Sequence, residues 1–407
     1  MHRRDFLLSS GIAPLVPLGA QAQASGGIKI TDIKTFVVGL ATRNLVFVKV
    51  ETDQKIDGIG EAYSCGPDEA TVAVIHDFKR WLVGQDPRNI EYLWALMYNF
   101  TRFPGGLVVN AALSGIEQAL WDISGKAAGL PVYMLLGGKC RDRVRLYQSA
   151  RGKDPKELAG HARALVDKYG YTAVKISPHM PEGNAAPYNR VTRVAGQRIR
   201  AVRDALGPDV DIAVDIHAKF FEVSRAVRLA QAIEPYHPMW LEEPIRPENV
   251  EAMAKLATHV TIPLASGECN YTKHEFKDLL VAQALDIIQP DVCLCGGLME
   301  LKKIAAMAQA HNVMVAPHNP MGPVATAVNV HFAASTPNFL ILEYVPDDEP
   351  PRSELVRQPL RVQKGYIPVP TQPGLGIELN EKAFKKYPPR AWHRGFDYRE
   401  DGSVAFI

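Results

Sequence analysis

The chain has 407 residues, of which 47% are hydrophobic and 22% charged, and its formal net charge is +2. This length is typical of two globular domains, and the near-neutral charge argues against a nucleic-acid or membrane-surface partner. The five cysteines lack the spacing of a disulfide scaffold or a zinc site, so we expect free thiols.

The first 24 residues resemble an export signal. Paired arginines (Arg3 and Arg4) precede a moderately apolar stretch that ends in Ala22-Gln23-Ala24. This order is typical of a signal peptide, and the paired arginines are typical of the twin-arginine route. A frayed amphipathic N-terminus is the alternative. We expect residues 1–24 to be a signal peptide and the protein to be periplasmic.

Residues 28–142 are predicted to form a small N-terminal α+β domain. Two strand-like runs, Ile28–Val38 and Asn44–Thr52, are followed by a glycine-rich turn or strand end at Gly58–Tyr63. Apolar residues then recur with a helical period, most clearly from Val108 to Gly129. The Gly-Leu-Pro sequence at the end of this run is a helix stop signal.

From residue 143 to residue 350, short apolar strands alternate with helical segments. Eight strands are expected, near Val144–Gln148, Ala173–Ile176, Ile212–Asp215, Trp240–Glu242, Pro263–Ser266, Ile287–Ile288, Val313–Ala316 and Leu340–Glu343. This alternation favours a parallel α/β barrel, and a doubly wound open sheet is the alternative. Residues 351–407 contain many prolines and glycines and are expected to pack on the N-terminal domain.

Charged residues at the ends of these strands are informative, because parallel strands are buried on both faces and are usually apolar. Six consecutive strands end in such a residue, separated by 23 to 27 positions, which is about one strand–helix unit. They are Asp215, Glu242 (or its neighbour Glu243), Glu268, Asp291, His318 and Glu343. A single residue of this kind is usually a helix cap or a salt-bridge partner. Six in register indicate an active site at the mouth of a barrel.

The residue types at these strand ends predict metal binding and proton transfer. Asp215, Glu242 and Glu268 are hard oxygen ligands of the kind that suits Mg²⁺. Asp291 and His318 come from adjacent strands, and an aspartate that binds one imidazole nitrogen makes the other a better base.

Two further side chains extend the predicted site. Lys175 ends the second strand, where it could neutralise carboxylates or act as a base. His217 lies two positions after Asp215, so in a continued strand the two side chains would face the same side. The long segment 178–196 before the third strand is a candidate lid.

Several motifs together resemble the enolase superfamily, and within it the mandelate racemase subgroup. They are GIGEAY (58–63), VDIHAKF (214–220), LEEPI (241–245), ASGECN (265–270), QPDVCLCGG (289–297), APHNPMGPVA (316–325) and LEY (342–344). Each motif alone is weak, but the combination is specific and covers nearly all of the chain after the signal. The resemblance implies an α/β fold, a (β/α)7β modified TIM barrel with an N-terminal α+β capping domain whose loops close over the substrate.

The resemblance also implies a role for each strand-end residue. The Mg²⁺ ligands would be Asp215, Glu242 and Glu268. The pair of Asp291 and His318 would remove the proton α to a substrate carboxylate. Glu343 would hydrogen-bond the carboxylate oxygen that gains charge, and Lys175 would lie near the same carboxylate.

One departure from the subgroup pattern bears on the reaction. Racemases of the subgroup carry Lys-x-Lys on the second strand, whereas this chain has Lys175-Ile176-Ser177, and serine is no base without an activating partner. Asp215-x-His217 instead resembles acid-sugar dehydratases of the galactonate dehydratase type, in which this histidine protonates the leaving hydroxyl.

The predicted function is therefore a Mg²⁺-dependent acid-sugar dehydratase, a hydro-lyase that removes the 3-hydroxyl and forms a 2-keto-3-deoxy acid. The alternatives are a racemase, epimerase or cycloisomerase on the same site, or a non-catalytic periplasmic sugar-acid binding protein. The expected substrate contacts are Gln148, Arg151 and Asn270, with Arg43, Arg102 and Phe103 of the N-terminal domain as further candidates. A symmetric homo-oligomer is common for barrel enzymes, but no interface can be read from the sequence.

Overall fold

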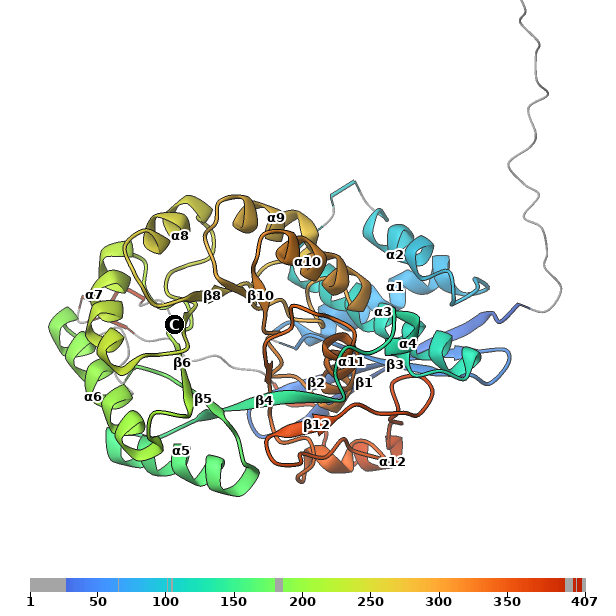
Figure 1. Cartoon of the computed structure of the whole chain (residues 1–407). Coiled ribbons are helices and arrows are strands. Elements are labelled where there is room, and N and C mark those ends of the chain that lie inside the picture. The colour runs from blue at the N-terminus through green and yellow to red at the C-terminus, as the bar shows by residue number, and fades with distance from the viewer. Residues whose placement is uncertain are drawn as a thin grey trace, which may run out of the picture.

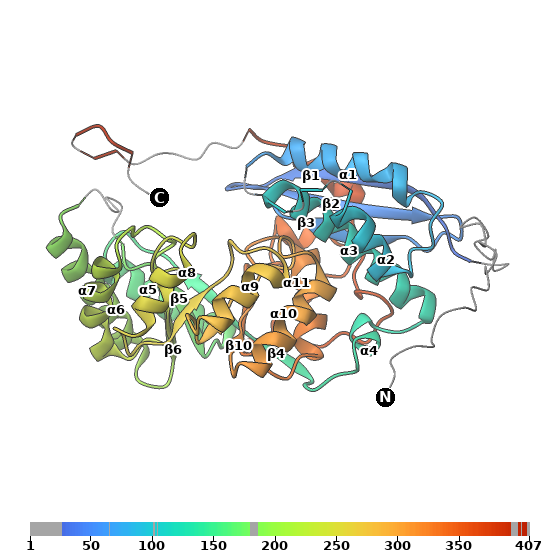
Figure 2. The same ribbon diagram turned by 90° about the horizontal axis from the view of Figure 1, so that it is seen from above.

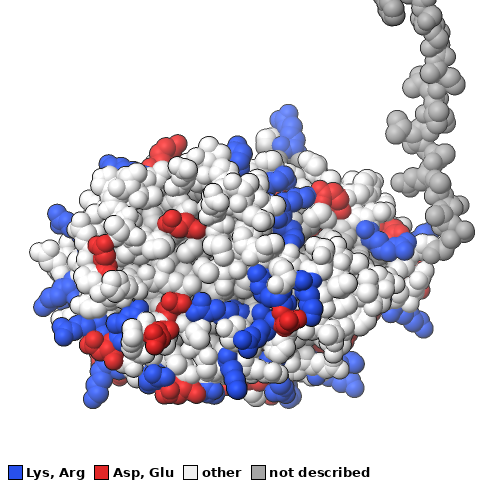
Figure 3. Space-filling model, in the orientation of Figure 1, with Lys and Arg blue, Asp and Glu red and all other residues white. Residues whose placement is uncertain are grey.

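The computed structural model describes residues 27–64, 66–100, 102–103, 105–179, 186–391, 398–399 and 401–404. The predicted signal peptide, Cys65 and residues 180–185 of the predicted lid lie outside these ranges. Within them, no helix is long and apolar enough to cross a membrane, and the four described cysteines are free thiols, as expected. Figure 3 shows basic and acidic side chains interspersed over the face in view.

The N-terminal part of the chain forms an antiparallel sheet covered by helices, here called the capping domain (Figure 2). Its elements are β1 (Ile30–Gly39), β2 (Asn44–Thr52), β3 (Gly58–Ala62), α1 (Asp68–Leu82), α2 (Ile90–Tyr98) and α3 (Leu107–Ala128). The glycine-rich segment expected as a turn or strand end is a full strand, β3, paired with β2. A Cβ atom at Gly60 would lie 1.9 Å from the carbonyl oxygen of Gly115, so α3 can pack this closely on β3 only against glycine.

The following part forms a barrel, for which the described residues supply eight parallel strands (Figure 1). They are β4 (Arg143–Ala150), β5 (Ala173–Ile176), β6 (Asp211–Asp215), β7 (Trp240–Glu242), β8 (Leu264–Ser266), β9 (Ile287–Ile288), β10 (Met314–Val315) and β11 (Leu342–Glu343). Strands consecutive in the chain are paired from β4 to β10, and β11 pairs with β4. Val315 exchanges backbone hydrogen bonds with Asn338 and Leu340, which joins β10 to the segment before β11. The predicted barrel is therefore confirmed, and the open-sheet alternative is wrong.

Helices connect the strands on the outside of the barrel, and seven of them lie in the described part of the chain between β4 and β11 (Figure 1). They are α5 (Pro155–Tyr169), α6 (Tyr188–Leu206), α7 (Val223–Ile233), α8 (Val250–Ala257), α9 (Thr272–Val281), α10 (Leu298–Ala310) and α11 (Pro323–Ala334). Seven helices with eight strands give the expected (β/α)7β form. The short elements are α4 (Val132–Leu135), η2 (Glu234–Tyr236), η3 (Arg352–Glu354), β12 (Tyr366–Pro368) and α12 (Glu381–Phe384).

An apolar layer fills the inside of the barrel, and each strand or its immediate neighbour contributes one buried residue to it. The layer consists of Tyr147, Ala173, Ala213, Trp240, Ala265, Ile287, Ala316 and Ile341. The rings of Tyr147 and Trp240 meet edge to face, with centroids 5.5 Å apart, and the small alanines leave room for them. This layer lies directly below the polar side chains of the barrel mouth.

Two buried carboxylates of the capping domain dock on the N-termini of barrel helices. Glu61 of β3 accepts hydrogen bonds from the N–H groups of Gly322 and Ala325 at the start of α11, at 2.6 and 3.0 Å. Glu117 of α3 accepts them from the first two N–H groups of α10, at 2.6 and 2.9 Å. Helix N-termini leave such groups unpaired and favour negative charge. The two contacts therefore fix the capping domain on the barrel.

The C-terminal segment contacts both parts of the molecule. Strand β12 pairs antiparallel with β4 of the barrel. Farther along, the N–H of Leu375 donates to Asp122 of α3 at 2.8 Å, and the ring of Phe384 stacks on Phe47 of β2 with centroids 5.4 Å apart. The segment thus runs from the barrel to the capping domain.

Helix α4 is joined to α11 through a buried histidine. The N–H of Tyr133 donates to Nδ1 of His331 at 3.2 Å, and the two rings stack. Burial lowers the pKa of His331 from 6.5 to about 4. The imidazole is therefore neutral at neutral pH, as a hydrogen-bond acceptor must be.

We expect Glu61→Gln to destabilise the protein, because a carboxamide accepts one of the two N–H groups and turns its own NH₂ toward the other. The expected loss in free energy of unfolding is about 1–3 kcal/mol, measured by urea denaturation. Glu69→Gln, at an exposed position in the first turn of α1, is the matched control and should be neutral. Equal midpoints for the two variants would contradict the docking role of Glu61.

Stability should also decrease as the pH falls from 6.5 to 4, because the unfolded chain takes up a proton at His331 that the folded protein excludes. The shift in pKa corresponds to about 3 kcal/mol. In thermal unfolding across this pH range, His331→Asn should lose less stability than the wild type. The exposed His259→Asn should behave like the wild type, and a wild-type slope in His331→Asn would assign the effect to another group.

Candidate active site

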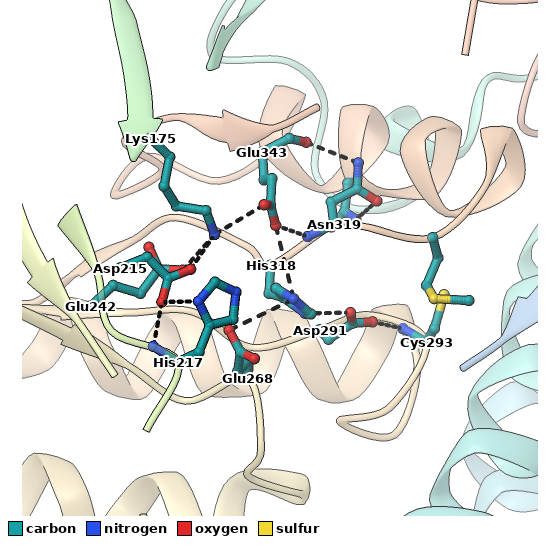
Figure 4. Close-up of polar contacts among 12 residues, drawn as sticks. Lys175, Asp215, His217, Glu242, Glu268, Asp291, Cys293, His318, Asn319 and Glu343 are labelled. Carbon is teal, nitrogen blue, oxygen red and sulfur yellow. Dashed lines mark hydrogen bonds and ion pairs between the residues drawn. The ribbon is translucent and has the colours of Figure 1, made fainter. Parts of the chain in front are cut away.

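The alternation of side chains along the strands determines which residues reach the barrel mouth. Side chains two positions apart on a strand face the same side, so the residues two positions after the apolar layer also point into the barrel. They are Ser149, Lys175, Asp215, Glu242, Gly267, Gln289, His318 and Glu343. Five of these are residues that the sequence predicts for the site, and Figure 4 shows them gathered with Glu268 and Asp291.

Of the two adjacent glutamates at the end of β7, Glu242 faces the mouth and Glu243 does not. Glu242 Oε2 accepts a hydrogen bond from the indole N–H of Trp240 at 2.8 Å. The backbone turns at Glu243, where φ is 43°, and its carboxylate binds the Ser266 hydroxyl and the N–H of Gly267. Burial raises the pKa of Glu243 to about 8. Of the two glutamates between which the sequence left the choice open, Glu242 is therefore the one that faces the barrel mouth.

The ammonium group of Lys175 contacts three carboxylates of the cluster (Figure 4). Its Nζ atom is 2.6 Å from Glu242 Oε1, 3.0 Å from Glu343 Oε1 and 3.1 Å from Asp215 Oδ2. Burial lowers the pKa of Lys175, but the charges of the three carboxylates outweigh burial and raise it well above its usual value. Burial and repulsion from Asp215 nevertheless raise the pKa of Glu242. One lysine therefore does not neutralise the cluster.

His318 is held by Asp291 in the orientation expected of a general base. Asp291 Oδ2 lies 2.8 Å from His318 Nδ1, and Asp291 Oδ1 accepts the N–H of Cys293 at 2.7 Å. With a proton on Nδ1, the free nitrogen is Nε2, which lies 3.6 Å from Glu268 Oε2. Burial lowers the pKa of His318, but the charge of Glu268 and the bond to Asp291 outweigh it and raise the pKa to about 10.

Glu343 is fixed by the residue that follows the histidine. Its Oε2 accepts the N–H of Asn319 at 3.0 Å, and its carbonyl oxygen accepts the Asn319 amide at 3.0 Å. Burial raises the pKa of Glu343, but the charges of Lys175 and His318 reverse the effect and lower it to about 2. Glu343 is therefore an ionised acceptor in this structure.

His217 reaches the mouth by a route that differs from the expected continued strand. Strand β6 ends at Asp215, and His217 is in the left-handed region, with φ of 57°. The turn places both the N–H and Nδ1 of His217 against Asp215 Oδ1, at 2.8 and 3.1 Å. The expectation that the two side chains share a strand face is wrong, although they are in contact. The His217 side chain is 55% exposed, so it is open to a ligand.

The donor set at the mouth fits a hard divalent cation in its chemistry. Asp215, Glu242 and Glu268 offer only oxygen atoms, and Asp215 Oδ2 is buried and is met by the ammonium group of Lys175 at 3.1 Å. The five carboxylates shown in Figure 4 exceed the charge of Lys175 and His318. As placed, no three His, Cys, Asp or Glu side chains among the described residues form a group that could hold an ion. Lys175 instead bridges Asp215 and Glu242.

A cavity of about 650 Å³ opens above these groups, between the barrel and the capping domain. Its lining includes eight residues expected from the sequence, namely Arg43, Gln148, Arg151, Lys175, His217, Glu268, His318 and Glu343. Asn270 does not line the cavity, and its side-chain amide donates to Glu275 at 3.3 Å. Arg102 and Phe103 do not line it either.

The lining also contains residues that the sequence analysis did not single out, among them Tyr63, Ser149 and His161. The ring of Tyr63 lies 6.2 Å from that of His318, and its position at the end of the GIGEAY motif was a usable signal. Ser149 follows from the strand alternation. His161 lies on α5, where nothing in the sequence distinguishes it from a surface histidine.

Comparison with known proteins agrees with this geometry. Residues 26–137 match the family model of the mandelate racemase/muconate lactonizing enzyme N-terminal domain, and residues 157–383 match that of the enolase C-terminal domain-like family. A D-galactonate dehydratase of Verminephrobacter eiseniae is 37% identical over 386 residues, which cover 93% of this chain and 100% of that protein. A D-galactonate dehydratase of Variovorax paradoxus is 36% identical over 387 residues, with the same coverage.

Comparison with solved structures agrees with the family models and the sequence relatives. An enolase from Agrobacterium radiobacter, crystallised with sodium and L-malate, superposes with a TM-score of 0.89 at 39% identity, covering 93% of this chain and 100% of that one. An enolase-superfamily member from Salmonella Typhimurium gives 0.84 at 35% identity, covering 89% and 98%. The chain thus belongs to the enolase superfamily and, within it, to the mandelate racemase/muconate lactonizing enzyme family.

Proposed function

We propose that this protein is a Mg²⁺-dependent dehydratase of sugar acids, a hydro-lyase. The observation that carries the proposal is that His318 and His217 line one cavity and that each is held by its own aspartate. An elimination needs a base for the α-proton and a separate acid for the leaving hydroxyl. Similarity to D-galactonate dehydratases over their full length supports loss of water as the reaction.

His318 is the proposed base. Its Nδ1–H is directed to Asp291, so Nε2 faces the cavity and can take the proton at C2 of the substrate. The pKa near 10 depends mainly on the attraction of Glu268. The role as a base therefore requires that the charge of Glu268 be neutralised.

Enolase-superfamily enzymes use a divalent metal, and we propose Mg²⁺ for this one, held by Asp215, Glu242 and Glu268. When bound, the cation supplies positive charge next to the substrate carboxylate, which gains charge as the α-proton leaves. Loading of the site requires that Lys175 give up its contacts with Asp215 and Glu242. Burial, with repulsion from Asp215, raises the pKa of Glu242 despite the contact with Lys175.

Lys175 and Glu343 are proposed to orient the substrate carboxylate. The role expected for Glu343, donation of a hydrogen bond to that group, needs a proton that the neighbouring Lys175 disfavours. Lys175 is always charged and can donate directly. We assign the contact with the substrate carboxylate to Lys175 and the positioning of Lys175 to Glu343.

His217 is the proposed acid. It protonates the 3-hydroxyl as the C–O bond breaks, and the enol product tautomerises to a 2-keto-3-deoxy acid. Racemisation would need a second base, but Ser177 stands at the position of the second lysine, and its hydroxyl accepts the N–H of His179 at 3.3 Å. This substitution disfavours the racemase alternative.

The proposal also includes the localisation and the oligomeric state of the protein. The paired arginines and the A-x-A sequence support periplasmic localisation by the twin-arginine route. A folded enzyme exported in this way would meet sugar acids outside the cytoplasm. A symmetric homo-oligomer, common among barrel enzymes, is part of the same proposal.

Metal binding tests the choice of Glu242 over Glu243. Titration calorimetry with Mg²⁺ should show that Glu242→Gln weakens binding by about 10- to 100-fold, because one of three charged ligands is lost. Glu243→Gln, the adjacent control, should bind Mg²⁺ like the wild type, with folding of both checked by circular dichroism. Equal losses in the two variants would overturn the assignment.

The reaction is tested by incubating the protein with Mg²⁺ and a set of aldonic and aldaric acids, followed by mass spectrometry in ²H₂O. We expect loss of water. His318→Asn should abolish both dehydration and exchange of the C2 proton, whereas His217→Asn should keep exchange and lose dehydration by about 10²- to 10⁴-fold.

His259→Asn, far from the cavity lining, is the control and should react like the wild type. Deuterium uptake at C2 without loss of water in the wild type would favour a racemase instead. Dehydration that survives in His217→Asn would refute the acid assignment.

A further inference from the structure

A half-buried histidine on helix α5, His161, lines the cavity but has no part in the proposed reaction. The backbone N–H of Arg151, directly after β4, donates a hydrogen bond to His161 Nδ1 at 2.9 Å. The carbonyl oxygen of Arg151 lies 3.1 Å from the same nitrogen. Because an N–H group is directed at Nδ1, this nitrogen is an acceptor and carries no proton. The proton of the neutral ring is therefore on Nε2.

The Nε2–H group of His161 is a donor that the described part of the protein leaves without an acceptor. The hydrogen-bond contacts of the ring in that part are made by Nδ1, with Arg151. The acidic residues described in the cavity lining, Glu268 and Glu343, face His318 and Lys175 instead. Since Nδ1 is turned to the backbone, Nε2–H is the polar group that His161 can present to the cavity.

Gln148 of β4 is constrained in a similar way. The hydroxyl of Tyr171 donates to Gln148 Oε1 at 3.3 Å, and burial raises the pKa of Tyr171, so this hydroxyl keeps its proton. With its oxygen engaged, the Gln148 side chain has the two N–H bonds of its amide left for the cavity that it lines. His161 and Gln148 therefore give the cavity wall next to β4 uncharged hydrogen-bond donors.

Uncharged donors at this wall suit a hydroxyl group of the substrate. The reacting carboxylate is already met by Lys175 and by the cation site in the proposed mechanism. The carbon chain beyond C3 of a sugar acid carries hydroxyl groups, whose oxygen atoms accept hydrogen bonds from amide and imidazole N–H groups. A site that binds such a hydroxyl discriminates against an analogue that lacks it, because the donors of the protein are then left unpaired.

We propose that His161 is a specificity-determining residue that, together with Gln148, binds one hydroxyl group of the substrate beyond C3 through its Nε2–H. This inference rests on the proposed dehydratase function and assigns a residue that recognises the carbon chain rather than the reacting carbons. Arg151 takes part through its backbone, which fixes the tautomer of His161.

The test compares galactonate with its 4-, 5- and 6-deoxy analogues in the presence of Mg²⁺. We expect His161→Leu to lower kcat/KM for galactonate about tenfold, mainly through KM, because one hydrogen bond to the substrate is lost. For the analogue that lacks the bound hydroxyl, the wild type should already be about tenfold slower, and His161→Leu should cause no further loss. His161→Gln, whose amide can place an N–H near the position of Nε2, should lie between the two. Lys156→Gln, an exposed position on α5 outside the cavity lining, is the control and should change neither value.

Equal losses for galactonate and all three analogues would give His161 a merely structural role and overturn the inference, as would a leucine variant that reacts like the wild type. Calorimetry with the His318→Asn protein and Mg²⁺ repeats the comparison without turnover, with folding checked by circular dichroism. Adding His161→Leu should weaken binding of galactonate and of two analogues about tenfold, but not of the third. If no acid loses water, the proposed reaction fails, whereas this pattern of binding still decides the role of His161.

Discussion

Mutual repulsion among carboxylates at one barrel mouth is the constraint on which the site depends. The strand alternation directs Asp215, Glu242 and Glu343 into the barrel, and Glu268 and Asp291 join them from the turns that follow β8 and β9. Lys175 contacts three of them, yet burial and repulsion from Asp215 still raise the pKa of Glu242. Carboxylates of the same cluster hold a proton on His318. Cation binding and base strength are therefore two aspects of one electrostatic balance.

Much of the fold could be predicted from the sequence because its apolar residues follow either the two-residue period of a strand or the 3.6-residue period of a helix. Each predicted barrel strand lies within two residues of its observed limits, since short apolar runs that alternate with helical segments indicate parallel strands. The strand alternation could even have separated Glu242 from Glu243, had the apolar layer with Trp240 and Ala213 been used as the reference. The site residues at strand ends could be identified from the sequence for the same reason.

Features that depend on turns or on contacts between residues far apart in the chain could not be predicted from the sequence. The left-handed conformation at His217 cannot be read from a local pattern, because most residues there would continue the strand. Asn270 looked like a mouth residue, but its partner Glu275 lies in the next helix. The docking of Glu61 on Gly322 joins residues 261 positions apart, and a buried glutamate in a strand gives no indication of such a distant partner.

The two docking carboxylates act on a particular part of the barrel. Glu61 and Glu117 bind the N-termini of α11 and α10, which follow the strands that lead to His318 and Asp291 (Figure 2). On α11, Thr326 accepts the amide of Asn319, which in turn fixes Glu343. The capping domain is thus anchored to the side of the barrel that removes the proton. The proposed acid and cation ligands lie at or just after the ends of β6, β7 and β8, and neither Glu61 nor Glu117 binds the helices that follow these strands. A change in the docking of the capping domain would therefore act first on the base and its aspartate.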